Sequence, residues 1–117
     1  MITIYGIKNC GSMKKAFAWF DEHGIEYSFH DYKKQGADLD VLKKACAVHG
    51  WEQVINRKGT SWRKLPEDMR ESMDEGKALQ SAQDNPSLVK RPLIVDGDTI
   101  LLGFDADRYF AQWKKAA

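Results

Sequence analysis

The chain has 117 residues, of which 43% are apolar and 30% charged, a composition that suits one globular domain able to bury a core without disulfides or a structural metal. Its 18 basic and 17 acidic residues leave a formal charge of +1, which argues against a surface for nucleic acid or for an anionic membrane. No stretch approaches the roughly 20 apolar residues of a spanning helix, and no basic leader precedes an apolar run. We therefore expect a cytoplasmic, monomeric protein with a single domain over residues 1–117.

The first third of the chain predicts a strand, a helix and a second strand. Residues 2–5 are mostly β-branched or aromatic and predict a short buried strand that ends at Gly6. Apolar residues recur at helical spacing from Met13, and Gly24 ends that helix. Residues 25–32 alternate between apolar and polar and predict the second strand, which so compact a unit pairs in parallel with the first.

The rest of the chain predicts a helical insertion, a hairpin and a last helix. Between about 38 and 85 there is no convincing strand, but there are several helical pieces. Two apolar runs, 93–95 and 99–102, are joined by an Asp-Gly-Asp turn typical of a hairpin, and Asp105 can cap a helix after them. Three aromatic residues of that helix are expected to face the core: Tyr109, Phe110 and Trp113. The order βαβ, helical insertion, ββα predicts an α/β, thioredoxin-like fold with a mixed four-stranded sheet.

Cys10 follows the first strand and precedes the first helix. At a helix N-terminus, unpaired backbone N–H groups and the helix dipole favour the thiolate, which is the nucleophilic form of cysteine. The flanking Asn9, Gly11 and Ser12 are polar or small, unlike the neighbours of a core residue, so we favour a reactive thiol over a small buried cap of the strand. Ser12 either donates a hydrogen bond to the thiolate or caps the helix, and the sequence favours neither.

A second reactive thiol is not evident. A dithiol oxidoreductase would have its resolving cysteine at position 13, where this chain has Met13. The other cysteine, Cys46, shares a helical face with leucines and is expected to be a buried core thiol. Any disulfide at Cys10 must be resolved by an outside thiol, or by Cys46 if the fold brings it near.

Two basic stretches are candidate anion sites. Pro92 directly precedes a strand, where proline is sometimes cis, and Arg91 before it is either an anion ligand or an ordinary surface arginine. The loop around Arg57 carries four basic residues, and we expect a solvated turn there rather than an anion cradle. The three histidines are scattered and show no metal spacing, so no metal site is expected.

Several spaced stretches resemble one protein family: ITIYGIKNC, HDYKKQG, NRKGTSWRKL, and KRPLIV followed by LLGF. Over essentially the whole chain they resemble the arsenate-reductase-like (ArsC/Spx) family of thioredoxin-fold proteins, and most of all its YffB branch. The resemblance implies a nucleophile at Cys10 and anion-binding arginines at Arg57 and at Arg91, which precedes a cis Pro92. Arsenate reductases of similar length have a third arginine after the hairpin, where this chain has Gly103.

The resemblance implies three functions, which we rank. The first is a glutathione-dependent thiol-disulfide reductase with no bound cofactor, for which glutathione is the co-substrate and a glutaredoxin or a disulfide-bearing protein the partner. The second is arsenate reduction with glutathione and glutaredoxin, which the absence of the third arginine makes less favourable. The third is an Spx-like transcriptional regulator that binds the RNA polymerase α-subunit; Met13 at the position of the switch cysteine argues against redox control of such binding.

Overall fold

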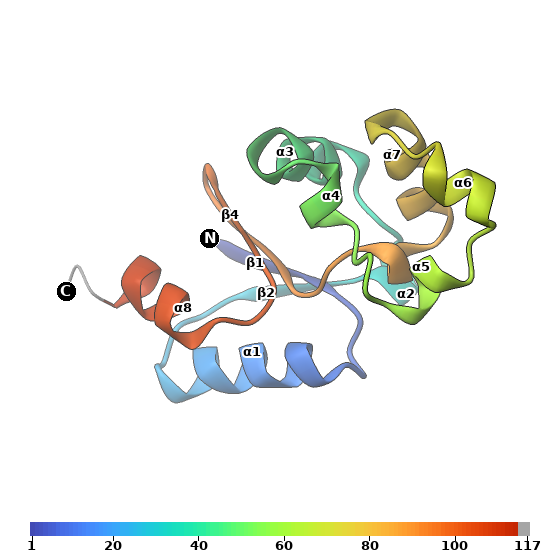
Figure 1. The fold of residues 1–117 in the computed structure, drawn as a ribbon. Helices are drawn as coiled ribbons and strands as arrows, with labels where there is room; N and C mark the ends of the chain where they lie inside the picture. Colours follow the sequence, from blue (N-terminus) through green and yellow to red (C-terminus); the bar gives the residue numbers. More distant parts are fainter. Residues whose placement is uncertain (115–117) are drawn as a thin grey trace.

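A computed structural model of the chain describes residues 1–114, in which helices cover both faces of a four-stranded sheet (Figure 1). The strands are β1 (Ile2–Gly6), β2 (Ser28–Asp31), β3 (Leu93–Asp96) and β4 (Thr99–Leu102). Their order in the sheet is β2-β1-β3-β4; β1 is parallel to β2, and the other two pairings are antiparallel. The mixed sheet and the order of the elements confirm the prediction, although β2 begins at Ser28 rather than Ile25.

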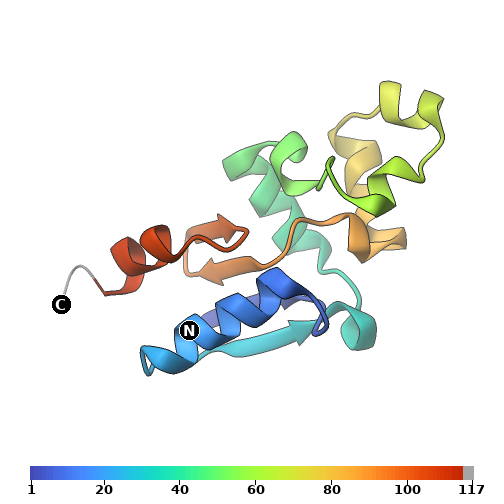
Figure 2. The ribbon, with the colours of Figure 1, turned by 60° about the horizontal axis from the view of Figure 1, so that its bottom comes forward.

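One face of the sheet is covered by α1 (Gly11–Glu22) and α8 (Ala106–Trp113), as Figure 2 shows from a second side. Ile4 and Ile94 point to this face from the two central strands, where they pack against Met13 and Phe20 of α1 and Tyr109 of α8. All five side chains are fully buried. Successive residues of a strand point to opposite faces, so the neighbours of Ile4 and Ile94 serve the other layer.

The other face is covered by the helical insertion, which joins β2 to β3 (Figure 1). Its elements are α2 (Tyr32–Gln35), α3 (Leu39–His49), α4 (Trp51–Val54), α5 (Thr60–Arg63), α6 (Glu67–Glu71), α7 (Glu75–Asp84) and the 3-10 turn η1 (Pro86–Leu88). Aspartate side chains cap two of the longer helices: Asp38 accepts from the N–H of Asp40, and Asp74 from that of Lys77. The insertion is therefore held by local caps as well as by its buried face.

A short antiparallel contact ties the end of α4 to the segment that leads into β3. Ile55 and Val89 form an isolated β-bridge. Beside it, the N–H of Asn56 donates to the carbonyl oxygen of Leu88 and the N–H of Lys90 to that of Val54, both at 2.8 Å. The middle of the insertion is thereby fixed in register against the residues just before Arg91.

The last helix shows one wrong prediction. Asp105 caps α8 as expected by accepting from the N–H of Arg108 at 3.1 Å, and Tyr109 is fully buried. The indole N–H of Trp113 donates to Asp96 at 2.8 Å, which ties the helix to the β3–β4 hairpin. Phe110 was expected in the core but is 50% exposed, because it follows Tyr109 directly and so points about 100° away from the buried stripe.

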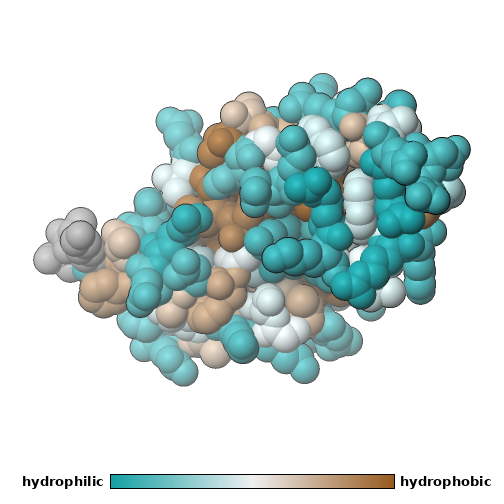
Figure 3. All heavy atoms as spheres, viewed as in Figure 1, coloured by the Kyte–Doolittle hydropathy of each residue, from teal (hydrophilic) through white to brown (hydrophobic). Residues whose placement is uncertain are grey.

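The face seen in Figure 3 is mostly hydrophilic, with hydrophobic residues gathered beside β4 where the insertion meets the hairpin. Val48 of α3 and Ile100 of β4 line a shallow hollow there, and Val48 is 58% exposed. In the part of the chain that the structure describes, none of the helices has the length and apolar content needed to span a bilayer.

Candidate functional site

The thiol of Cys10 lies at the N-terminus of α1. Cys10 is the N-cap residue, with extended backbone angles (φ −141°, ψ 134°), and its carbonyl oxygen accepts the helical bond from the N–H of Lys14 at 3.0 Å. The side chain is half-buried, while Asn9 before it and Gly11 and Ser12 after it are exposed. A ligand can therefore reach the sulfur at the end of the helix where the backbone N–H groups are unpaired.

The surroundings of Cys10 favour its thiolate. Partial burial raises the pKa of the thiol, but hydrogen bonds from the backbone N–H groups of Met13 and Ser12, together with the hydrogen bond and positive charge of Arg91, lower it by more. The net pKa lies below that of an ordinary cysteine. Ser12 contributes through its backbone N–H, and separate roles for its hydroxyl and for Asn9 stay predictions.

Arg91 reaches the thiol from the segment before β3. Its peptide bond to Pro92 is cis, and Pro92 is fully buried. The guanidinium donates from Nη1 to the carbonyl oxygen of Ser87 at 3.3 Å, while the buried Nε–H has no partner among the described residues. Arg91 is thus held by the backbone of η1 while it interacts with Cys10, which distinguishes it from a free surface arginine.

The side chain of Met13 fills the position at which a second thiol would stand. Met13 is fully buried and packs over Gly6 at the end of β1: a Cβ added at Gly6 would lie 2.5 Å from the methionine sulfur. This contact joins the first turn of α1 to the sheet. The backbone N–H of Met13 is one of the groups that lower the pKa of Cys10, so the contact helps to hold that group in place.

Cys46 belongs to the other layer of the protein. It is buried in α3, 5% exposed, in the hydrophobic cluster formed by the insertion, whereas Cys10 packs against the cluster under α1. Burial, with smaller contributions from Glu75 and Glu52, raises the pKa of Cys46 to about 11. The predicted core thiol is confirmed, and the sheet separates it from Cys10.

Arg57 lies in a basic hollow that also contains Lys90, the residue before Arg91. Its guanidinium carbon is 5.8 Å from the ring centroid of Trp51, and no contact of the described residues joins it to the Cys10 sulfur. The hollow has a volume of about 280 Å³ and is lined by cationic, polar and apolar residues: Glu52, Gln53, Ile55, Asn56, Arg57, Lys58 and Lys90. The anion-binding role of Arg57 stays a prediction. The expected solvated turn between helices is confirmed, since it connects α4 to α5 and the four basic residues of this stretch are exposed.

Sequence patterns did not indicate Lys90 as a candidate, although it directly precedes Arg91. Its side chain lies over Gly103, where an added Cβ would lie 3.2 Å from the lysine Cε and 3.9 Å from its Nζ. Gly103 has φ +80°, a conformation that favours glycine. The position at which the resemblance leads one to expect a third arginine is thus covered by a different cation.

A further hollow, more open and of about 660 Å³, lies outside this site. It is found at the far end of α1, between Phe20 and Phe29, away from the thiol. Within residues 1–114, histidine, cysteine and acidic side chains form no group of three or more that could hold a metal ion.

Comparisons with known proteins agree with this geometry. The model of the ArsC family matches residues 5–111. An uncharacterised protein of Haemophilus influenzae is 43% identical over 111 residues, which cover 95% of this chain and 97% of that protein. The global transcriptional regulator Spx of Listeria innocua is 29% identical over 92% of this chain and 82% of its own length.

Solved structures give the same result. The YffB protein superposes with a TM-score of 0.92 at 47% identity, over 95% of this chain and 97% of that one. A protein of Brucella melitensis described as arsenate reductase (ArsC) related is also 47% identical, with a TM-score of 0.75 over 97% of this chain and 94% of that one. The chain has a cysteine of lowered pKa at its first helix and a cis proline after Arg91, and it matches these proteins along nearly its whole length; it belongs to the ArsC family.

Proposed function

We propose that the protein is a glutathione-dependent thiol-disulfide reductase that uses Cys10 as its single nucleophile. The observation that supports this most is the half-buried thiol at the N-terminus of α1, with two backbone N–H groups and Arg91 directed at it. Such surroundings lower the pKa of the thiol and so raise the fraction of thiolate, the form that attacks disulfides.

The reaction has two exchanges. The Cys10 thiolate attacks the glutathione sulfur of a glutathionylated partner, so that a Cys10–glutathione disulfide forms and the partner leaves as thiolate. A second glutathione thiolate then attacks the adduct, which releases Cys10 as thiolate and yields glutathione disulfide. The reductant consumed is one glutathione thiolate, whose sulfur leaves in glutathione disulfide bonded to the glutathionyl group that came from the partner. Arg91 stabilises the sulfur anion at the start and at the end of the cycle.

An outside thiol is required because the chain offers no suitable second one. Met13 stands where a resolving cysteine would be, and Cys46 lies across the sheet with a raised pKa. A thiol of high pKa is mostly protonated at neutral pH and attacks slowly.

The test is the reaction of the wild-type protein, Cys10→Ser and Cys46→Ser with glutathione disulfide over a pH series, followed by intact-mass and peptide mass spectrometry. We expect one adduct, on Cys10, in wild type and in Cys46→Ser, with an apparent pKa below the roughly 8.5 of free cysteine. Reaction at Cys10 no faster than at a cysteine in the urea-unfolded chain would reject the proposal.

Arsenate reduction is the second candidate, because the same thiolate and Arg91 suit attack on an oxyanion, and a relative at 47% identity is described as arsenate reductase related. Purified protein with glutathione and glutaredoxin should then consume reducing equivalents when arsenate is added, and Cys10→Ser should not. No consumption above the Cys10→Ser background removes this candidate.

A regulatory role is the third candidate, supported by the Spx regulator at 29% identity. It predicts capture of the chain by the C-terminal domain of the RNA polymerase α-subunit. The pull-down should succeed equally with Cys10→Ser, because Met13 leaves no dithiol switch in the first turn of α1. Failure to recover either the wild type or Cys10→Ser counts against this role.

A further inference from the structure

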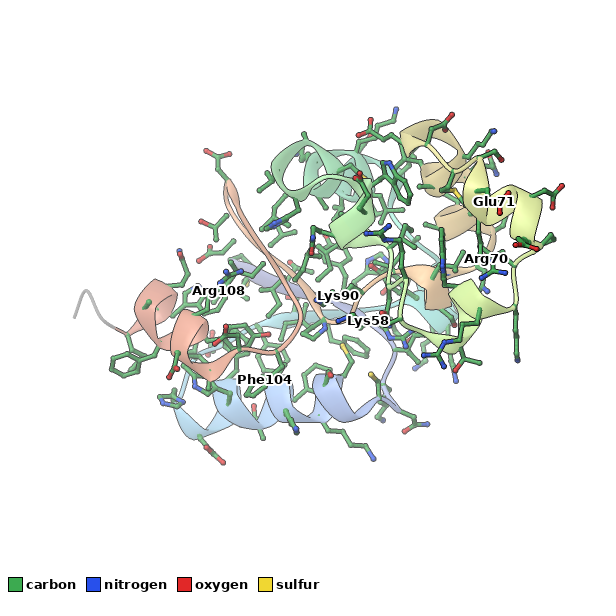
Figure 4. The ribbon with its side chains drawn as sticks, in the orientation of Figure 1. Lys58, Arg70, Glu71, Lys90, Phe104 and Arg108 are labelled. Carbon is green, nitrogen blue, oxygen red and sulfur yellow. The ribbon has the colours of Figure 1, made fainter. Side chains whose placement is uncertain are left out.

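The residues that line the basic hollow around Arg57 are held together by the short antiparallel contact between the end of α4 and the segment before β3. Ile55 and Val89 are bridged, and the N–H of Lys90 donates to Val54, so that the end of α4 and the segment before Arg91 cannot slide past each other. This register brings Lys58 and Lys90, from distant parts of the chain, to one hollow (Figure 4). Lys90, which lines the hollow, is thus the residue directly before Arg91, the arginine that interacts with the Cys10 thiol.

The hollow contains three cations without ionic partners. Among the described residues, one ion pair within 4.0 Å is found, and it joins the N-terminal amino group to Asp96. Arg57, Lys58 and Lys90 therefore form no ion pair with a carboxylate of the described chain. Glu52 is the one acidic residue of the lining. Three positive charges against one negative give an excess that favours an anionic ligand.

Lys90 is directed by its contact with Gly103. The glycine offers no side chain, and its φ of +80° makes any other residue strained, so the aliphatic stem of Lys90 can lie directly over the backbone. Figure 4 shows Lys90 next to Lys58, between the insertion and the layer that contains Phe104. Because Gly103 has no side chain, it leaves room for the side chain of Lys90, a position that the sequence alone does not predict.

We propose that Lys90, with Arg57 and Lys58, binds a carboxylate of the glutathionyl group that is disulfide-bonded to Cys10. The inference rests on the proposed function and deepens it, since it names the part of the co-substrate that these residues recognise. Glutathione carries one carboxylate at its γ-glutamyl end and one at its glycine end, while its sulfur is bound at Cys10. A carboxylate in the hollow would meet donors from both sides of the contact between α4 and the segment before β3, which a neutral thiol lacking that group could not use.

The test compares disulfides with and without carboxylates. Second-order rate constants for adduct formation at Cys10 are measured with glutathione disulfide and with neutral 2-hydroxyethyl disulfide, for wild type, Lys90→Gln, Lys90→Arg and the control Lys43→Gln. Lys43 is an exposed lysine of α3 outside the hollow, so its variant reports the general effect of removing one charge. We expect Lys90→Gln to slow glutathione disulfide by about three- to fivefold relative to Lys43→Gln, the size of an exposed ion pair, and to leave 2-hydroxyethyl disulfide unchanged.

The outcomes separate the two proposals. Rescue of the glutathione rate by Lys90→Arg supports a charge contact; equal rates for Lys90→Gln and Lys43→Gln overturn the carboxylate site while a fast wild-type reaction leaves the proposed function intact. Wild-type Cys10 that prefers 2-hydroxyethyl disulfide would instead overturn glutathione dependence itself. The disulfide of glutathione monoethyl ester, blocked at glycine, shows which end binds: a retained effect of Lys90→Gln assigns the γ-glutamyl carboxylate, and a lost effect assigns that of glycine.

Discussion

The contact between Gly6 and Met13 can be tested by a double-mutant cycle. A Cβ added at Gly6 would lie 2.5 Å from the Met13 sulfur and 2.7 Å from its methyl carbon, well inside ordinary van der Waals contact of about 3.5–4.0 Å. Overpacking of this kind lowers the free energy of unfolding by roughly 1–3 kcal/mol. Met13→Ala removes a fully buried side chain and should lower it by about 2–5 kcal/mol.

In the double variant the added methyl group enters the space that the methionine has left. The overpacking cost then disappears. The double variant should therefore lose roughly 1–3 kcal/mol less unfolding free energy than the sum of the losses in the two single variants. Urea unfolding of the wild type, Gly6→Ala, Met13→Ala and the double variant measures this difference. Additivity within about 0.5 kcal/mol would refute the tight packing of Met13 over Gly6.

Three further predictions concern the thiols and Gly103. Arg91→Gln removes a cation and a hydrogen bond from Cys10, so the pH midpoint of alkylation by iodoacetamide should rise; an unchanged midpoint would mean that Arg91 does not act on the thiol. The pKa of Cys46 is raised in the folded state, so the folded protein holds its proton longer than the unfolded chain: from pH 9 to about 11 the wild type should lose stability relative to Cys46→Ala, and parallel urea midpoints over that range would contradict this. Gly103→Ala forces a side chain into φ +80° and against Lys90, and should lower the free energy of unfolding by about 1–2 kcal/mol; a thermal melt indistinguishable from wild type would argue against the strain.

Local patterns were sufficient to predict the order of the elements and the place of the thiol. The apolar strand before Cys10 and the helical spacing after it depend on residues close in sequence, and the structure has Cys10 as the N-cap of α1. The buried state of Cys46 followed in the same way from the leucines on its helical face. Phe110 shows the limit of this approach, because the width of a helix's buried stripe depends on what packs against it.

The site itself depends on contacts between distant segments. Sequence spacing could not show that Arg91 reaches Cys10 while its backbone belongs to the other end of the chain, nor that Arg57 stacks near Trp51. The sequence did not indicate Lys90, because the direction of its side chain depends on the space left by Gly103, which follows the hairpin and has no side chain. A pattern of residue types carries no information about such an approach until the fold is known.

The bridge between Ile55 and Val89 links the helical insertion to the segment that carries Arg91, one of the groups that lower the pKa of Cys10. Arg91 follows a segment that is held to the insertion by two amide hydrogen bonds, those of Asn56 and Lys90. A local opening that breaks them would free the backbone of the segment from which Arg91 reaches the sulfur. The exchange rates of these two amide hydrogens with deuterium therefore report how often the segment before Arg91 separates from the insertion.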